Sequence, residues 1–135
     1  MRILALDYGS ARCGCAVSDP SATIATPLQP VPRPATRRGL SRLRSLAREL
    51  GAQRIVVGLP LSLSGGHTPQ TAQARAFAAS LAEAVKVPVE LYDERLTTKL
   101  AARLGGSSSE DSRAAALLLE SWLSARDGSS ALSHG

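Results

Sequence analysis

Short apolar runs alternate with longer amphipathic stretches along most of this chain. The first apolar run, at residues 2–7, ends at an acid and is followed by Tyr8-Gly9, which predicts a buried strand that stops at a turn. A second strand is predicted at residues 13–18, paired with the first through a short connection. Further strands are predicted at residues 22–25, 54–58 and 87–92.

Other stretches have the spacing of helices. Apolar residues recur at helical spacing over residues 36–50, and Gly51 is expected to end that helix. A second helix is expected to begin with Thr68 as N-cap and Pro69 at its first position, and its apolar stripe contains Phe77 and Leu81. The rest of the chain predicts a short helix at 96–104, a break at 105–109 and a strong helix at 110–125.

Two segments predict no regular structure. The prolines between residues 27 and 34 predict an extended linker, and the Gly/Ser-rich tail at 127–135 is expected to be disordered. The predicted order is β-β-β-α-β-α-β-α-α, within a single domain at residues 1–126. The fold class is therefore α/β, a mixed sheet of about five strands flanked by helices, in which ligands collect at the carboxyl ends of parallel strands.

Two acids follow predicted strands directly. Asp7 ends the first strand, where a carboxylate is costly unless a cation or hydrogen-bond donors compensate it. The alternative is a turn aspartate that binds the loop amides before Gly9. Glu94 follows the strand at 87–92. Capping of the next helix explains the neighbouring Asp93. For Glu94, both a capping role and a functional role are consistent with the sequence.

A third acid, Asp111, lies at the start of the last predicted helix. Its offsets from Ala115, Leu118 and Trp122 put it on the same helix face as the buried stripe. The helix dipole alone could tolerate an acid there, but a metal shared with other acids explains an inward aspartate better.

The three acids are far apart in sequence, and this topology brings them to one edge of the sheet. Carboxylate oxygens without His or Cys suit Mg²⁺ or Mn²⁺. Two such ions about 4 Å apart can clamp an in-line attack on phosphate. The pattern therefore predicts phosphodiester hydrolysis, with Asp7, Glu94 and Asp111 as catalytic residues and metal ligands.

Other chemistries have weaker support. The spacing of Asp7, Gly9 and Gly14 also matches a phosphate loop of the actin and sugar-kinase type, but those ATPases need two domains and a far longer chain. The histidines, His67 and His134, are expected in a surface loop and in the tail. No serine lies in a Gly-x-Ser-x-Gly elbow.

The charge balance points to an acidic partner. The formal net charge is +5 over 135 residues, and the basic residues are nearly all arginine, which binds phosphate with two parallel hydrogen bonds. Genomic base composition would also favour arginine. Arg37, Arg44 and Arg48 share one side of the first predicted helix, either as a track for a phosphate backbone or as a solvated face. Aromatic residues make up 3%, so we expect sequence-blind backbone contacts rather than base stacking.

The remaining features concern the compartment. The start of the chain lacks the apolar stretch and cleavage site of a signal peptide, and no run of about 18 apolar residues exists, so we expect a cytoplasmic protein without a membrane partner. Cys13 and Cys15 are expected to be small buried side chains on one strand face, with a redox pair as the alternative.

Several motifs together resemble the YqgF/RuvX family of pre-16S ribosomal RNA nucleases, also described as Holliday-junction-resolvase-like. The resemblance covers nearly the whole chain, and the combination of Asp-Glu-Arg-Leu-Thr-Thr with Val-Gly-Leu-Pro is highly specific. The matching segments are Leu-Asp-Tyr-Gly at 6–9 with Gly14, Val-Gly-Leu-Pro-Leu at 57–61 with Gly65, Thr-Ala-Gln-Ala-Arg-Ala-Phe at 71–77, Asp-Glu-Arg-Leu-Thr-Thr at 93–98, and residues 111–123.

The resemblance implies a ribonuclease-H-like fold, the metal site of the three acids, and trimming of the 5′ end of 16S ribosomal RNA. It implies structured RNA or branched DNA as substrate, the small ribosomal subunit as a partner, and a monomer or weak homodimer. Junction resolution and a non-cleaving role in ribosome assembly or transcription are the alternatives. Residues in the matching motifs are expected to contact substrate: Gly9, Gly58, Leu59, Pro60, Arg75 and Arg95.

The sequence departs from the family pattern at one place. Members usually carry a longer basic segment between the Thr-Thr pair and the helix aspartate, whereas residues 99–110 alone intervene here. The three acids are retained, whereas the nucleic-acid contacts expected from that segment are not predicted by this shorter sequence.

Overall fold

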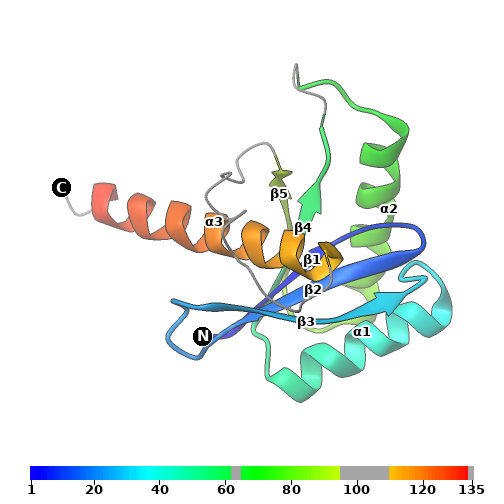
Figure 1. Ribbon diagram of the computed structural model, residues 1–135, viewed down its shortest axis with the longest axis horizontal. Helices are drawn as coiled ribbons and strands as arrows, with labels where there is room; N and C mark the ends of the chain where they lie inside the picture. The colour runs from blue at the N-terminus through cyan, green and yellow to red at the C-terminus, as the bar shows by residue number, and fades with distance from the viewer. Residues whose placement is uncertain (62–64, 95–109, 134–135) are drawn as a thin grey trace.

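A mixed sheet organises the part of the chain that the computed structural model describes: residues 1–61, 65–94 and 110–133, with the backbone alone at 110–111 and 127–133. Figure 1 shows the elements in order. They are β1 (Ile3–Asp7), β2 (Arg12–Ser18), β3 (Ala25–Pro32), α1 (Arg37–Leu50), β4 (Arg54–Leu59), α2 (Pro69–Ala84), β5 (Val89–Asp93) and α3 (Glu110–Ser133).

The sheet has five strands in the order β3-β2-β1-β4-β5. β1 is antiparallel to β2 and parallel to β4, and β4 is parallel to β5. The carboxyl ends of β1, β4 and β5 therefore lie at the same edge of the sheet. Since ligands collect where parallel strands end, this edge is the place to look for a site. The mixed five-stranded sheet confirms the predicted fold class.

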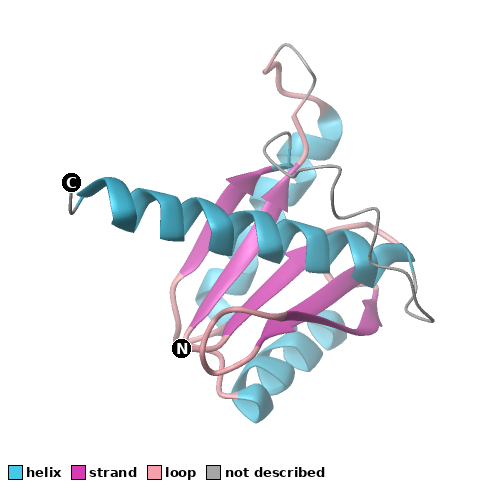
Figure 2. Cartoon of the chain, turned by 60° about the vertical axis from the view of Figure 1, so that its left-hand side comes forward, coloured by secondary structure: helices cyan, strands magenta, loops and turns pink. Residues whose placement is uncertain are grey.

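Helices cover both faces of the sheet. Figure 2 shows α3 across one face, with α1 and α2 behind the other. The α1–α2 layer has the larger core, which includes both cysteines; Cys13 and Cys15 are fully buried on the same face and form no disulfide, as predicted. The main side chains of this core are Leu4, Leu6, Val31, Leu43, Ile55, Val57, Phe77 and Leu81.

Among the described helices, α3 is the one that packs on the opposite face. The predicted stripe of Ala115, Leu118 and Trp122 is buried there against Ala5 and Val56 of the central strands. Among the described residues, no helix is both long enough and apolar enough to cross a membrane.

The prolines after residue 25 lie in a strand and not in the predicted linker. β3 spans Ala25–Pro32 and pairs with β2 through Ala16 opposite Pro27 and Arg12 opposite Pro32. Proline cannot donate to a ladder, so it is tolerated in β3 because this strand is at the sheet edge and needs a partner on one side only. An irregularity between Cys13 and Cys15 accommodates the mismatch in register.

Helix ends agree with the sequence prediction except at the last helix. Thr36 and Gly51 cap α1, and Thr68 caps α2 with Pro69 in its first turn. α3 continues to Ser133, whereas the sequence predicted a disordered tail from residue 127. No proline interrupts this stretch, and its one glycine costs a helix only about 1 kcal/mol. The helix predicted at 96–104 lies outside the described residues.

Candidate active site

Asp7 and Glu94 meet where β1 and β5 end, with β4 between them. Their side chains share a hydrogen bond. They line a cleft of about 370 Å³ at the carboxyl edge of the sheet. The other lining residues are Tyr8, Gly9, Ser10, Pro60, Gln70 and Gln73. Two of the three acids predicted from the sequence are thus neighbours.

Glu94 is held in an environment that opposes its ionisation. Burial, followed by the hydrogen bond to Asp7 and the negative charges of Asp7 and Asp93, raises the pKa of Glu94 to about 8. Near neutral pH, a proton therefore bridges the two carboxyl groups. A divalent cation bound between them would take the place of that proton. The pair therefore has the chemistry of a cation site built from hard oxygen ligands.

Gly58 makes room for the Glu94 carboxyl group. A Cβ atom added at Gly58 would lie 2.5 Å from Oε1 of Glu94, closer than real Cβ contacts allow. Gly58 is in β4, directly beside Tyr92 of β5 in the register. The sequence predicted a substrate contact at this glycine, whereas the structure shows that its missing side chain accommodates the acid. Leu59, its neighbour in the same motif, is buried.

Pro60 forms the rim of the cleft and is tied to α2. The hydroxyl group of the fully buried Thr71 donates a hydrogen bond to the Pro60 carbonyl. The same hydroxyl oxygen accepts a hydrogen bond of 3.0 Å from the Thr68 amide, which completes a capping box. The start of α2 is thereby fixed beside the strand end, and Gln70 and Gln73 line the cleft one turn apart.

The turn after β1 contributes Tyr8, Gly9 and Ser10 to the lining of the cleft. The ring of Tyr8 stacks on Phe77 of α2 with centroids 4.7 Å apart. Gly9 lies so close to the Arg12 carbonyl that a Cβ atom would be 2.7 Å from that oxygen. A glycine is therefore needed for the chain to return tightly into β2.

Asp111 belongs to the first turn of α3, and its side chain lies outside the described residues. The next residue, Ser112, is fully buried; its oxygen accepts a hydrogen bond of 3.4 Å from the Cys15 amide, and its hydroxyl donates to the Leu28 carbonyl. Cys15 follows Gly14, the register partner of Asp7. The start of α3 is therefore anchored close to the edge that carries Asp7. Arg95 is outside the described residues.

Other acids have structural partners instead. Glu90 accepts hydrogen bonds from Arg54 at 2.8 Å and from the Trp122 indole at 3.1 Å. Asp19 accepts from the Thr23 and Ile24 amides, each at 2.8 Å, in the turn between β2 and β3. No cluster of three or more metal-ligating side chains occurs among the described residues.

Sequence reasoning missed several residues of the cleft. Tyr8, Ser10, Gln70 and Gln73 line it, while Arg75 is exposed on α2 and is not among the lining residues. The three-residue spacing of the glutamines just after the N-cap was the available signal. Using this spacing to predict a site requires knowing which face of α2 adjoins the end of β1.

Comparison with known proteins agrees with this architecture. The family model RuvX, described as Holliday junction resolvase, matches residues 1–125. A protein of Chloroflexus aggregans named "Putative pre-16S rRNA nuclease" is 40% identical over 133 residues, which is 92% of this chain and 94% of that protein. A protein of the same name from Clavibacter michiganensis is 50% identical over 96 residues, covering 70% of this chain and 60% of that protein.

A solved structure supports the fold. The Thermus thermophilus RuvC chain, in complex with a Holliday junction substrate, superposes with a TM-score of 0.67 at 16% identity, covering 95% of this chain and 96% of that one. At this identity the likeness concerns the fold, which is ribonuclease-H-like in both. The match of the family model over nearly the whole chain shows that the protein belongs to the RuvX family.

Proposed function

We propose that the protein is a metal-dependent nuclease that hydrolyses phosphodiester bonds at the cleft of Asp7 and Glu94. The observation that carries this proposal is the hydrogen-bonded pair of carboxyl groups in one cleft at the carboxyl ends of parallel strands. Asp111 is proposed as the third ligand, since Ser112 anchors its helix turn beside the register partner of Asp7.

Each group in the cleft has a role in this reaction. Mg²⁺ or Mn²⁺, as two ions, would supply the chemistry of an activated water and of charge stabilisation at the leaving oxygen. Asp7 and Glu94 would hold the cation, and Glu94 would have to lose its proton to do so. The amide groups of Gln70 and Gln73 donate hydrogen bonds to the phosphate or sugar of the strand in the cleft. Pro60 and Tyr8 limit the width of the cleft. Arg75 and Arg95 are proposed to neutralise more distant phosphates of the substrate.

The proposed substrate is structured precursor ribosomal RNA, cut in the maturation of the 16S 5′ end, in the context of the small ribosomal subunit. The names of relatives 40% and 50% identical support this assignment. Branched DNA is a second candidate, supported by the description of the matching family model as a junction resolvase.

A cleavage assay separates these candidates. Precursor 16S RNA and a four-way DNA junction are incubated in parallel with the protein and Mg²⁺ or Mn²⁺, with EDTA and the Asp7→Asn variant as controls. We expect metal-dependent cutting of the RNA that the variant loses. Faster cutting of the junction would reverse the ranking of substrates. Binding of RNA without product under every condition would refute the nuclease and favour an assembly factor.

A further inference from the structure

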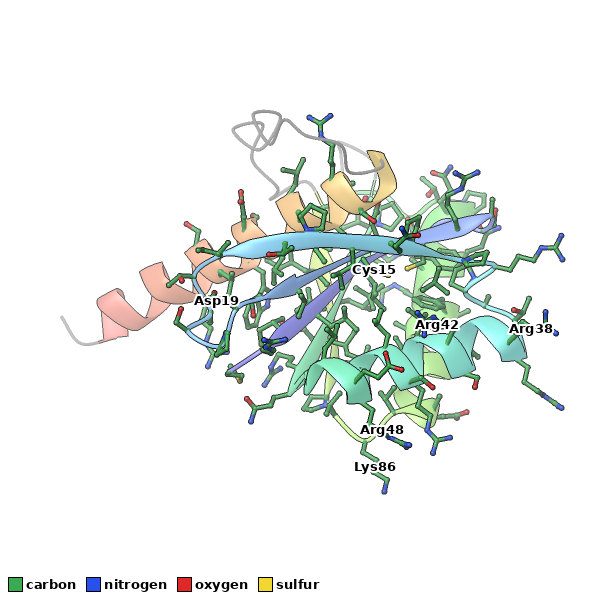
Figure 3. The ribbon with its side chains drawn as sticks, turned by 60° about the horizontal axis from the view of Figure 1, so that its bottom comes forward. Cys15, Asp19, Arg38, Arg42, Arg48 and Lys86 are labelled. Atoms are coloured by element: carbon green, nitrogen blue, oxygen red, sulfur yellow. The ribbon has the colours of Figure 1, made fainter. Side chains whose placement is uncertain are left out.

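A second depression, lined with arginine side chains, lies at the same edge of the sheet as the cleft. It has a volume of about 650 Å³ at the junction of β3 and α1. Arg33, Arg38 and Arg42 line it and are exposed, and none of them pairs with an acid among the described residues. Figure 3 shows Arg38 and Arg42 along the first half of α1. We call this depression the β3–α1 groove.

The groove is built on a tightly packed turn. A Cβ atom at Gly39 would collide with the Arg33 carbonyl, so α1 packs directly on the connection from β3. The Arg33 carbonyl also accepts hydrogen bonds from the Thr36 hydroxyl at 2.7 Å and the Thr36 amide at 3.2 Å. The Thr36 hydroxyl in turn accepts a hydrogen bond from the Gly39 amide at 3.1 Å. The backbone that carries the arginines is therefore held in one conformation.

The groove and the cleft are connected through the turn after β1. The Arg33 amide donates a hydrogen bond of 2.9 Å to the Ala11 carbonyl, and Ala11 directly follows Ser10 of the cleft. β3 and β1 are separated by one strand, β2, so their ends are about 10 Å apart at the usual strand spacing. At about 3.4 Å of helix rise for each nucleotide, that distance corresponds to roughly three nucleotides.

We propose that the β3–α1 groove binds backbone phosphates of the nucleic-acid substrate on one side of the bond that is cut. This inference rests on the proposed function, since it assigns the groove to the strand that occupies the cleft. Guanidinium groups hold phosphate oxygens through paired hydrogen bonds, and contacts to phosphate carry no sequence information directly. Arg38 and Arg42, one helical turn apart, supply two such contacts along α1.

The same helix offers a matched control. Arg44 and Arg48 line a different depression together with Lys86, Val85 and Val87. Figure 3 shows Arg48 and Lys86 together, away from Arg38 and Arg42. Val87 precedes β5, so this second cluster lies toward the amino ends of the parallel strands, at the sheet edge opposite the cleft. Neutralising either pair removes the same charge from α1.

The binding test uses a fluorescein-labelled RNA hairpin with a single-stranded 5′ extension, followed by anisotropy in EDTA so that cleavage does not intervene. For Arg38→Gln/Arg42→Gln we expect binding on the order of tenfold weaker, with the slope of log K against log salt lower by about 1.5, because two phosphate contacts are lost. For Arg44→Gln/Arg48→Gln we expect a change of less than about twofold. Thermal unfolding of both variants verifies that these exposed substitutions leave the fold intact.

Equal losses of RNA affinity in the two double variants would overturn the proposal, since the change in net charge alone would then explain both losses. Undiminished binding in the Arg38/Arg42 variant, or no RNA binding by the unaltered protein, would overturn it as well. Cleavage in Mg²⁺ provides a separate readout: the groove variant is expected to raise KM about tenfold with kcat nearly unchanged. If the binding difference appears while the unaltered protein cuts nothing, the groove stands and the nuclease assignment fails.

Discussion

Glu94 shows how strongly one carboxyl group depends on its neighbours. Its burial and its closeness to Asp7 raise its pKa to about 8, whereas Glu90, near the start of the same strand β5, accepts hydrogen bonds from Arg54 and Trp122. Both are glutamates of the same segment, but one sits among negative charges and the other among donors. The described residues that line the cleft include Asp7 and Glu94 and no lysine or arginine, and a cleft of this composition is suited to bind a cation.

Cation binding is therefore expected to release a proton. Glu94 is protonated below a pH of about 8 in the ion-free protein and must ionise to bind a metal, so affinity rises with pH up to about 8 and then levels off. Calorimetry of Mn²⁺ binding at pH 7 in two buffers of different ionisation enthalpy is expected to show release of about one proton, and almost none at pH 9.5. Binding at pH 7 without proton release would contradict the assigned state of Glu94.

Gly58→Ala tests the space beside this acid. The new methyl group would lie 2.5 Å from Oε1 of Glu94, so the carboxyl group must move out of place. We expect Mn²⁺ affinity at least about tenfold weaker, comparable to the loss of a second-shell partner. Gly51→Ala is the control: Gly51 has a φ of 65°, so alanine there costs about 1 kcal/mol of stability yet should leave Mn²⁺ affinity unchanged. Equal affinities of the two variants would refute the role of Gly58.

At the level of elements, the shape of the cleft depends on hydrogen bonds that join the first turns of α2 and α3 to the ends of neighbouring strands. Thr71 fastens α2 to Pro60 after β4, and Ser112 fastens α3 to β2 and β3. Both hydroxyl groups are buried and belong to the first turn of their helix. Short polar side chains at these two places therefore orient whole helices toward the same edge.

Thr71→Val tests one of these attachments. Valine keeps the shape but leaves the Pro60 carbonyl and the Thr68 amide without their partner, so we expect the free energy of unfolding to fall by about 1–3 kcal/mol. Urea unfolding measures this change. Thr23→Val, which alters an exposed hydroxyl in the turn held by Asp19, is expected to cost less than about 0.5 kcal/mol. A Thr71 variant as stable as the unaltered protein would show that the attachment contributes nothing to folding.

At the scale of the whole molecule, the spacing of apolar residues and the positions of capping residues predicted most helices and strands, because both signals act locally. The rule that parallel strands end together also predicted that Asp7 and Glu94 would meet. The third strand was predicted at residues 22–25 but lies at Ala25–Pro32, because proline excludes a central strand and an edge position cannot be recognised before the sheet order is known. Gln70, Gln73 and the space at Gly58 depend on contacts between β4, β5 and α2, which no local pattern encodes.

The basic surface illustrates the same limit. The sequence singled out Arg37, Arg44 and Arg48 because they share a helix side, and all three are exposed. The structure divides them: Arg44 and Arg48 adjoin Lys86, whereas Arg37 adjoins Arg38 and Arg42 near the cleft edge. The path of the chain from β3 into α1 decides which arginines lie toward the sheet edge of the cleft.

The most direct test of the account is the metal-dependent cleavage rate of precursor 16S RNA by single-acid variants. Asp7→Asn, Glu94→Gln and Asp111→Asn are each expected to lower the rate at least about 100-fold, because each removes a proposed cation ligand. Glu90→Gln, which replaces an acid engaged by Arg54 and Trp122, should stay within a few-fold of the unaltered protein. Loss of activity confined to the three acids would support the nuclease centre, and full activity in any one of the three would contradict it.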